Sequence, residues 1–142
     1  MSDVLLELPI AATPEQVFSA ITEQAGLSSW WTPDVVAEPK LGSVGEFRFR
    51  GGQFVIKMEI TALEPGRTVR WVVRQGAPDW AGTHVTWDLA PADQGTKVRF
   101  GQRGYASVEG SFASAAFNWA WYLGSLKDYL ETGQGRPGQL HT

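Results

Sequence analysis

The stretch of residues 111–132, SFASAAFNWAWYLGSLKDYLET, decides the fold that we expect for this chain. Its apolar residues recur at steps of four and three, which at roughly 100° per residue places them on one face of a helix. The residues of this face are Phe112, Ala116, Trp119, Leu123, Leu126 and Leu130. Ser107 or Ser111 can cap the start, and Gly133 stands where a left-handed C-terminal cap belongs. The pattern therefore predicts one long helix with a buried face.

Most of the chain before this helix alternates between apolar and polar residues, as antiparallel strands with one packed and one solvated face do. Strands are expected at residues 4–10, 35–38, 46–50, 54–63, 68–74, 83–89 and 96–104. After the first strand, Thr13, Pro14 and Gln16 predict a helix that begins with a capping box. Residues 26–31 predict a second short helical turn. We interpret the charged outer faces of the strands as solvated surface.

This order of elements predicts an α+β fold. A helix of about twenty residues spans roughly 30 Å, enough to lie across a sheet of this size. The sheet must curl to keep its inner face on the helix, and glycines at positions 42, 45, 51 and 52 could provide the bends. We expect residues 1–135 to form one domain and residues 136–142 to form a flexible tail.

Composition argues against several classes of function. The 142 residues carry a formal net charge of −3, so the concentrated basic face that binds nucleic acid is not expected. Cysteine is absent, which excludes disulfides and thiolate sites. No apolar run is long enough to span a membrane, and the acidic Asp3 stands where a signal peptide would carry basic residues. We expect a cytoplasmic protein without membrane insertion.

Aromatic residues are abundant, with seven Trp, seven Phe and three Tyr. Such rings usually build a core, but around a bent sheet they can also leave a void, and both interpretations stay open. The side chains that we expect to line a ligand-binding void are Trp30, Trp31, Phe47, Phe49, Met58, Trp71, Trp87, Phe100, Gln102, Phe112, Trp119, Tyr122 and Leu123, with Phe54 and Ile56 on the same side. Met58, Trp71, Trp87 and Trp119 are the best candidates for touching a ligand, because apolar pockets have aromatic walls with few polar groups.

Some of these side chains have two interpretations. The strand alternation points Gln102 inward, where an unpaired amide would cost roughly 1–3 kcal/mol. It either pairs with Tyr105 or a backbone group, or orients a polar group of a ligand. Asn118 and Tyr122, on the flank of the helical face, have the same two interpretations. Residues 30–31, both tryptophan, either pack in the core and cap an edge or form part of a ligand wall or gate.

Signals for catalysis are few. His84 lies on the expected outer face without a partnered acid, and Asp34 and Asp79 fit turns. The sequence contains no Ser-His-Asp arrangement, glycine-rich phosphate loop or His/Asp spacing typical of a metal site. We therefore expect no catalytic residue, no metal and no cofactor.

Several segments resemble one family in order and spacing. They are ATPEQVF (12–18), IT (21–22), LSSWW (27–31), LEP (63–65), RTV (67–69) with Trp71, THVTWDLAP (83–91), GTKV (95–98), and the closing Trp119, Leu123, Leu126, YLE (129–131) and Gly133. Together they resemble the activator-of-Hsp90-ATPase homologue 1-like domains of the START/polyketide-cyclase/Bet v 1-like (SRPBCC) superfamily. The resemblance covers residues 2 to about 135.

The resemblance implies the helix-grip fold, in which a curved seven-stranded antiparallel sheet wraps the long C-terminal helix around an apolar cavity. The family's general role implies binding of a small hydrophobic or aromatic molecule, more expected here than enzymatic activity. One alternative is a polyketide cyclase/dehydratase-like enzyme that uses the same cavity, with Gln102 and Tyr122 as its polar groups. Another is an Hsp90-related co-chaperone or protein-interaction module.

Two aromatic residues lie opposite the buried face of the long helix. Phe117 and Trp121 are four residues apart, and such rings are enriched in the cores of protein interfaces. They predict a homodimer contact, unless loops or the C-terminal tail cover them.

Overall fold

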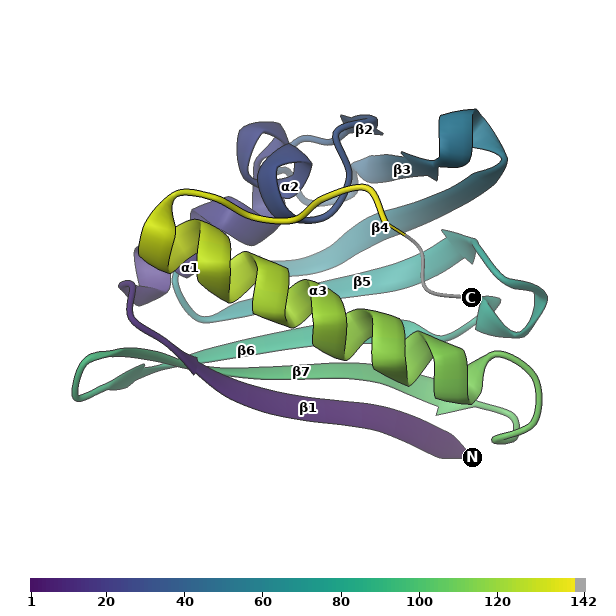
Figure 1. Cartoon of the computed structure of the whole chain (residues 1–142). Helices are drawn as coiled ribbons and strands as arrows, with labels where there is room; N and C mark the ends of the chain where they lie inside the picture. Colours follow the sequence, from purple (N-terminus) through teal and green to yellow (C-terminus); the bar gives the residue numbers. More distant parts are fainter. Residues whose placement is uncertain (140–142) are drawn as a thin grey trace.

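In the computed structural model, which describes residues 1–139, a curved antiparallel sheet wraps a long C-terminal helix (Figure 1). The strands are β1 (Ser2–Ile10), β2 (Val35–Val36), β3 (Val44–Phe49), β4 (Phe54–Glu64), β5 (Thr68–Gln75), β6 (His84–Ala92) and β7 (Gly95–Tyr105). The helices are α1 (Pro14–Thr22), α2 (Gln24–Trp30) and α3 (Phe112–Thr132), with short 3₁₀ turns η1 (Arg50–Gly52) and η2 (Pro78–Trp80). The predicted α+β helix-grip architecture is confirmed.

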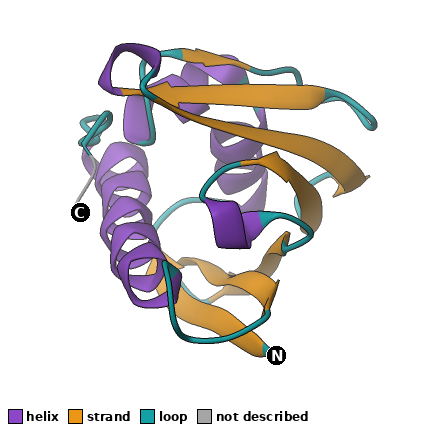
Figure 2. Ribbon diagram, turned by 90° about the vertical axis from the view of Figure 1, so that its right-hand side faces the viewer, coloured by secondary structure: helices purple, strands orange, loops and turns teal. Residues whose placement is uncertain are grey.

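The seven strands follow the order β1-β7-β6-β5-β4-β3-β2, and every neighbouring pair is antiparallel. Figure 2 shows the sheet curling around α3, with α1 and α2 on the same side as this helix. Of the four glycines expected to bend the sheet, Gly42, Gly51 and Gly52 lie outside the strands with positive φ angles, and Gly45 lies within β3. The register irregularities that bend strands fall instead within β1 and β4.

The two short helices pack against each other at one end of the sheet. The predicted capping box of α1 is present: Gln16 N donates to Thr13 Oγ1 at 3.1 Å and Thr13 N donates to Gln16 Oε1 at 2.9 Å. Gly26 lets α2 approach α1 closely, because a Cβ there would lie 2.5 Å from the Ala20 Cα. The Trp30 indole then donates a 2.8 Å hydrogen bond to the Ala20 carbonyl. These contacts fix the end of α2, where Trp31 follows.

Helix α3 packs its predicted face onto the sheet. Trp119, Leu123 and Leu126 are buried, and so are Ala115 and Tyr122 beside them, because the curved sheet covers more than one stripe of the helix. Ser111 occupies the N-cap position but makes no side-chain cap hydrogen bond to the helix. Gly133 ends the helix as predicted, with φ 84° and its N–H bonded to the Tyr129 carbonyl at 2.9 Å.

The segment after α3 runs across α2 and α3. Arg136 N donates to Ser125 Oγ at 2.6 Å, and Gly138 N donates to the Trp31 carbonyl at 2.7 Å. Gly135 is buried where a Cβ would lie 2.3 Å from the Ser29 carbonyl oxygen. The first part of the predicted tail, residues 136–139, therefore contacts the helices, and residues 140–142 lie outside the described part of the chain.

None of the described helices has the length and apolar character needed to cross a lipid bilayer. Within residues 1–139, no three or more His, Asp or Glu side chains are grouped so that they could hold a metal ion.

Candidate functional site

A cavity of about 260 Å³ lies between the N-terminal half of α3 and the part of the sheet formed by β3 and β4. Its lining residues come from the C-cap of α2, from β3, η1 and β4, from η2 and the residue before it, and from α3. They are Trp31, Phe49, Arg50, Phe54, Ile56, Ala77, Trp80, Ser114, Ala115, Asn118, Trp119 and Tyr122. Most of these side chains are apolar, which suits an apolar or aromatic guest.

Five aromatic side chains surround the cavity as a closed circuit, which we call the five-ring wall. Successive ring centroids lie 6.2 Å apart for Trp31 and Phe49, 6.2 Å for Phe49 and Phe54, 6.4 Å for Phe54 and Trp80, 6.3 Å for Trp80 and Trp119, and 5.1 Å for Trp119 and Trp31. All five spacings fall in the range of favourable aromatic pairs. Each ring therefore supports its neighbours around the void.

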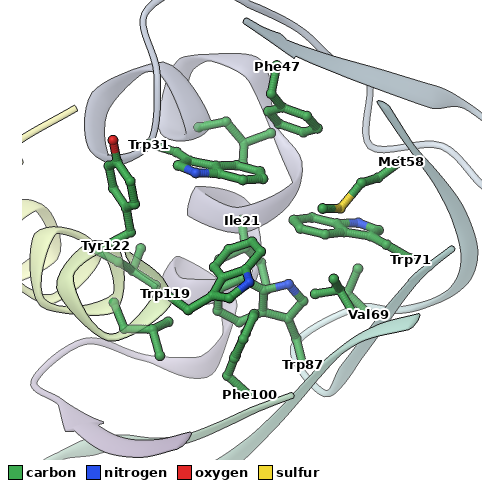
Figure 3. Packing of buried hydrophobic residues seen from close by; sticks show 14 of the residues in the cluster. Ile21, Trp31, Phe47, Met58, Val69, Trp71, Trp87, Phe100, Trp119 and Tyr122 are labelled. Carbon is green, nitrogen blue, oxygen red and sulfur yellow. The ribbon is translucent and has the colours of Figure 1, made fainter. Parts of the chain in front are cut away.

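Trp31 joins the cavity to the packed core. As the C-cap residue of α2 it is held by its backbone N–H, which donates to the Leu27 carbonyl at 3.0 Å. Its ring lies parallel to Trp71, at 6.1 Å and 1°, and contacts Phe47 at 4.3 Å. Figure 3 shows Trp31 between these rings and Trp119. Its position is therefore set by both the helix end and the core.

Trp119 is held by a buried polar network. Its Nε1 donates to Gln102 Oε1 at 2.8 Å, and the Tyr105 hydroxyl donates to the same oxygen at 2.8 Å. Gln102 Nε2 donates to Thr83 Oγ1 at 3.0 Å, and the Thr83 hydroxyl donates to the Trp80 carbonyl at 2.7 Å. The predicted pairing of Gln102 with Tyr105 is confirmed. Gln102 does not line the cavity but orients a residue that does.

Trp80 is held through the start of α3. Its Nε1 donates to Ser111 Oγ at 3.1 Å, and Ser111 in turn donates to Asp79 from Oγ at 2.5 Å and from its backbone N–H at 3.0 Å. Burial works to raise the pKa of Asp79, but the hydrogen bonds from Ser111 outweigh it, and the pKa lies below the ordinary value. Asp79 therefore stays ionised and anchors the η2 loop to the helix.

Tyr122 presents a buried hydroxyl whose proton finds no acceptor among residues 1–139. Burial raises its pKa strongly, and the nearby backbone of Gln139 opposes the rise only in part. A backbone group that lowers a tyrosine pKa is a donor, so the hydroxyl proton of Tyr122 still lacks an acceptor. Tyr122 therefore remains a neutral donor beside the cavity.

The exposed lining residues are Arg50 and Ser114. Arg50 has φ 54° and is followed by Gly51 and Gly52, both also at positive φ, in the turn between β3 and β4. Asn118, one turn of α3 beyond Ser114, donates from Nδ2 to the Ser114 carbonyl at 2.8 Å. These polar residues form the rim of the cavity.

Four of the thirteen expected lining residues line this cavity: Trp31, Phe49, Trp119 and Tyr122. The other nine do not; they are Trp30, Phe47, Met58, Trp71, Trp87, Phe100, Gln102, Phe112 and Leu123. The middle of the sheet, where a void was expected, is filled because Trp87 packs edge-on against Trp71 at 5.8 Å and Phe100 at 4.9 Å. The cavity lies nearer to the end of the sheet that carries η1 and η2.

Sequence reasoning missed five lining residues: Arg50, Ala77, Trp80, Ser114 and Ala115. The first three lie in the connections between strands, where strand alternation assigns no inward side, and the other two lie on α3 beside its predicted face. The isolated tryptophan in the glycine-flanked loop GAPDWAG (76–82) was the available signal for Trp80. Gly76 makes room for it, since a Cβ there would lie 2.8 Å from the Trp80 ring.

The predicted outward pair on α3 has two different environments. Phe117 is 56% exposed. Trp121 is partly buried, with the Arg136 guanidinium 4.5 Å from its ring centroid. The C-terminal segment thus covers Trp121, one of the two expected alternatives.

A family profile described as activator of Hsp90 ATPase homolog 1-like protein matches residues 11–131. The solution structure of the Aha1 dimer from Colwellia psychrerythraea is similar over 95% of this chain and 100% of that chain, with 34% identity and a TM-score of 0.87. Protein MLL2253 from Mesorhizobium loti is 24% identical over 92% of this chain and 97% of that one, with a TM-score of 0.80.

A more divergent structure shares the fold. DynU16, a putative protein in the dynemicin biosynthetic locus, has a TM-score of 0.79 and 21% identity over 95% of this chain and 49% of its own. A search of curated proteins found no match.

Proposed function

Because the chain belongs to the activator of Hsp90 ATPase homolog 1-like family, with a helix-grip fold, we propose that it binds a small hydrophobic or aromatic molecule between α3 and the sheet. The observation that carries the proposal is the five-ring wall around a cavity of about 260 Å³. Buried Trp, Phe and Tyr side chains normally fill the space between them. Here five of them line a void that opens to solvent at its rim.

The expected affinity follows from buried area. An aromatic group buries about 150–250 Å², which at about 25 cal/mol per Å² contributes about 4–6 kcal/mol. This range corresponds to a Kd between roughly 1 mM and some tens of micromolar. Contacts with the polar rim would tighten binding further.

The polar groups among the lining residues suit ligand binding better than catalysis by a polyketide cyclase/dehydratase-like enzyme. They are hydroxyls, an amide and the Arg50 guanidinium. General acid–base catalysis works best with a group whose pKa lies near the operating pH, and burial moves the pKa of Tyr122 away from neutrality.

A cavity-filling variant tests the proposal. Ser114 is exposed and lines the cavity, so Ser114→Phe would place a ring at its mouth, whereas Ala113→Phe adds the same ring to α3 away from the lining residues. A metabolite and lipid panel is screened by thermal shift and native mass spectrometry. We expect wild type and Ala113→Phe to share ligands that Ser114→Phe loses. A panel without hits, or hits that Ser114→Phe keeps, would contradict the proposal.

We also propose a homodimer contact through the Phe117 face of α3. A relative 34% identical to this chain was solved as a dimer, and Phe117 is a large apolar side chain with 56% exposure. Light scattering coupled to size-exclusion chromatography tests it. We expect Phe117→Lys to shift the protein toward monomer and Leu41→Lys, at an exposed apolar residue in the loop between β2 and β3, to leave the mass unchanged. A wild type that is monomeric at high concentration would refute the contact.

A further inference from the structure

The C-terminal segment, residues 134–139, turns back along α3 toward the cavity (Figure 1). Arg136 N donates to Ser125 Oγ at 2.6 Å. Three residues later the segment reaches Tyr122, about one helical turn nearer to the start of α3. Burial raises the pKa of Tyr122, and the backbone of Gln139 opposes this rise. Residue 139 therefore lies beside a side chain that lines the cavity.

The segment also holds the backbone that carries Trp31. Gly138 N donates to the Trp31 carbonyl at 2.7 Å. The preceding carbonyl, that of Trp30, accepts from Ser125 Oγ at 2.9 Å, and the same serine accepts from Arg136. The Trp31 ring lines the cavity on its other side. The C-terminal segment thus fixes this residue from outside, where a guest would contact it from inside.

Few contacts hold the segment in place. Gly135 is buried, Pro137 is partly buried and the other four residues are exposed. The Arg136 guanidinium lies 3.4 Å from the Asp128 carboxylate, but this ion pair is on the surface. Segments with little buried area and few hydrogen bonds open at a lower free energy than the core. The C-terminal segment can therefore undock while the sheet and α3 stay folded.

We infer that docking of the C-terminal segment and occupancy of the cavity stabilise each other, with Trp31 as the shared residue. A guest gains its full contact with the five-ring wall only when the Trp31 ring is in place, and the docked segment fixes the backbone of that ring. Coupling between two such events is reciprocal, so each favours the other by the same factor. The inference rests on the proposed function and adds an element outside the cavity that sets its affinity.

Amide hydrogen exchange of the full chain with a neutral two-ring probe, 2-naphthamide, tests the coupling. An engineered cavity of about 150 Å³ takes benzene, so a cavity of about 260 Å³ has room for a larger ring system. With saturating probe we expect exchange at Arg136 and Gly138 to slow by about fivefold or more, the lower end of typical coupling between sites. The amide of Gly42, bonded to the Ile60 carbonyl at 2.9 Å in another loop, should be unaffected.

A variant that undocks the segment tests the reverse direction. In Gly135→Ala the added Cβ would lie 2.3 Å from the Ser29 carbonyl oxygen, so the segment cannot dock, whereas every lining side chain is kept. Calorimetry should show a Kd for 2-naphthamide about fivefold or more above that of wild type, matching the change in exchange. Gly42→Ala places alanine at φ 86° with no atom within 4 Å of its Cβ. It strains the backbone and should leave the Kd unchanged.

The outcomes separate the coupling from cavity binding itself. Probe binding that leaves exchange at Gly138 unchanged, or slows it no more than at Gly42, would overturn the inference alone. The same holds if Gly135→Ala exchanges freely at Gly138 and still binds the probe as tightly as wild type. Because the exchange measurement uses the unaltered chain, it decides the matter even if Gly135→Ala does not fold. If wild type does not bind 2-naphthamide, the coupling and the proposed binding of such rings fail together.

Discussion

The indole of Trp119 on α3 donates a 2.8 Å hydrogen bond to the side-chain amide of Gln102 on β7, and both side chains are at most 3% exposed. This bond fixes Trp119, one member of the five-ring wall, to strand β7. The same amide oxygen accepts from Tyr105, at the end of β7. Helix, sheet and cavity wall therefore depend on a single buried glutamine.

Replacing this glutamine should be costly. Gln102→Leu leaves the Trp119 indole N–H and the Tyr105 hydroxyl buried without their acceptor. Because each orphaned polar group costs about 1–3 kcal/mol, we expect the free energy of unfolding to fall by about 2–4 kcal/mol in urea denaturation. Gln94→Leu, in the exposed turn between β6 and β7, should change it by less than about 0.5 kcal/mol. Equal effects of the two changes would contradict the network.

Tyr122 beside the cavity and Tyr105 in the Gln102 network should respond in opposite directions when their hydroxyls are removed. Tyr122→Phe removes a buried hydroxyl that has no acceptor in the described part of the chain, so we expect stability to rise by about 1 kcal/mol. Tyr105→Phe removes a hydroxyl that donates to Gln102, so stability should fall by about 1–2 kcal/mol. Parallel thermal and urea unfolding of the two variants measures both signs. A loss of stability in Tyr122→Phe would show that its hydroxyl has a partner.

Asp79 should make stability depend on pH on the acidic side. Its folded pKa lies below the ordinary value, because the hydrogen bonds from Ser111 outweigh the opposing effect of burial. The stabilisation is therefore fully present above the unfolded pKa of about 3.9 and is lost as the pH falls through the folded value. We expect wild type to be more stable than Asp79→Asn at pH 7, with the difference shrinking below about pH 4.

The matched variant Asp93→Asn removes an exposed carboxylate in the β6–β7 turn. Denaturation of the three proteins between pH 2.5 and 7 separates the two sites. A gap between wild type and Asp79→Asn that stays constant across this range would argue against an ionised Asp79 anchor.

The sequence predicted the architecture because its signals are local and periodic. Alternation along the strands, the capping box at Thr13 and the glycine after α3 each depend on neighbours in the chain. The same alternation turned Gln102 inward correctly, and the residue is fully buried. Trp80, by contrast, lies in a loop whose position depends on the contact between Asp79 and Ser111, which are 32 residues apart.

The place of the cavity could not be read from periodicity. Alternation tells which side chains face inward, but not which of them meet. The rings at the middle of the sheet, such as Trp71 and Trp87, fill their space by edge-to-face packing. Near η1 and η2 the facing groups on α3 are the small Ser114 and Ala115, so the surrounding rings do not close the gap. Packing of this kind is decided by tertiary contacts.

The C-terminal segment should be tied to the core through one serine. Ser125 on α3 is fully buried; it donates from Oγ to the Trp30 carbonyl at 2.9 Å and accepts from Arg136 N at 2.6 Å. Ser125→Ala leaves both backbone groups without a partner, so we expect a loss of about 1–3 kcal/mol. Amide hydrogen exchange should also become faster at Arg136 and Gly138, the residues whose N–H groups hold the segment.

A control variant distinguishes the loss of the Ser125 hydrogen bonds from a general effect of removing a hydroxyl from α3. Ser114→Ala removes an exposed hydroxyl that donates to the Ser111 carbonyl at 3.2 Å within the same helix. It should leave exchange at Arg136 and Gly138 unchanged. Because Gly138 bonds to the carbonyl of Trp31, release of the segment would also loosen one side of the five-ring wall. Protection of Gly138 that persists in Ser125→Ala would mean that the segment is held without the serine.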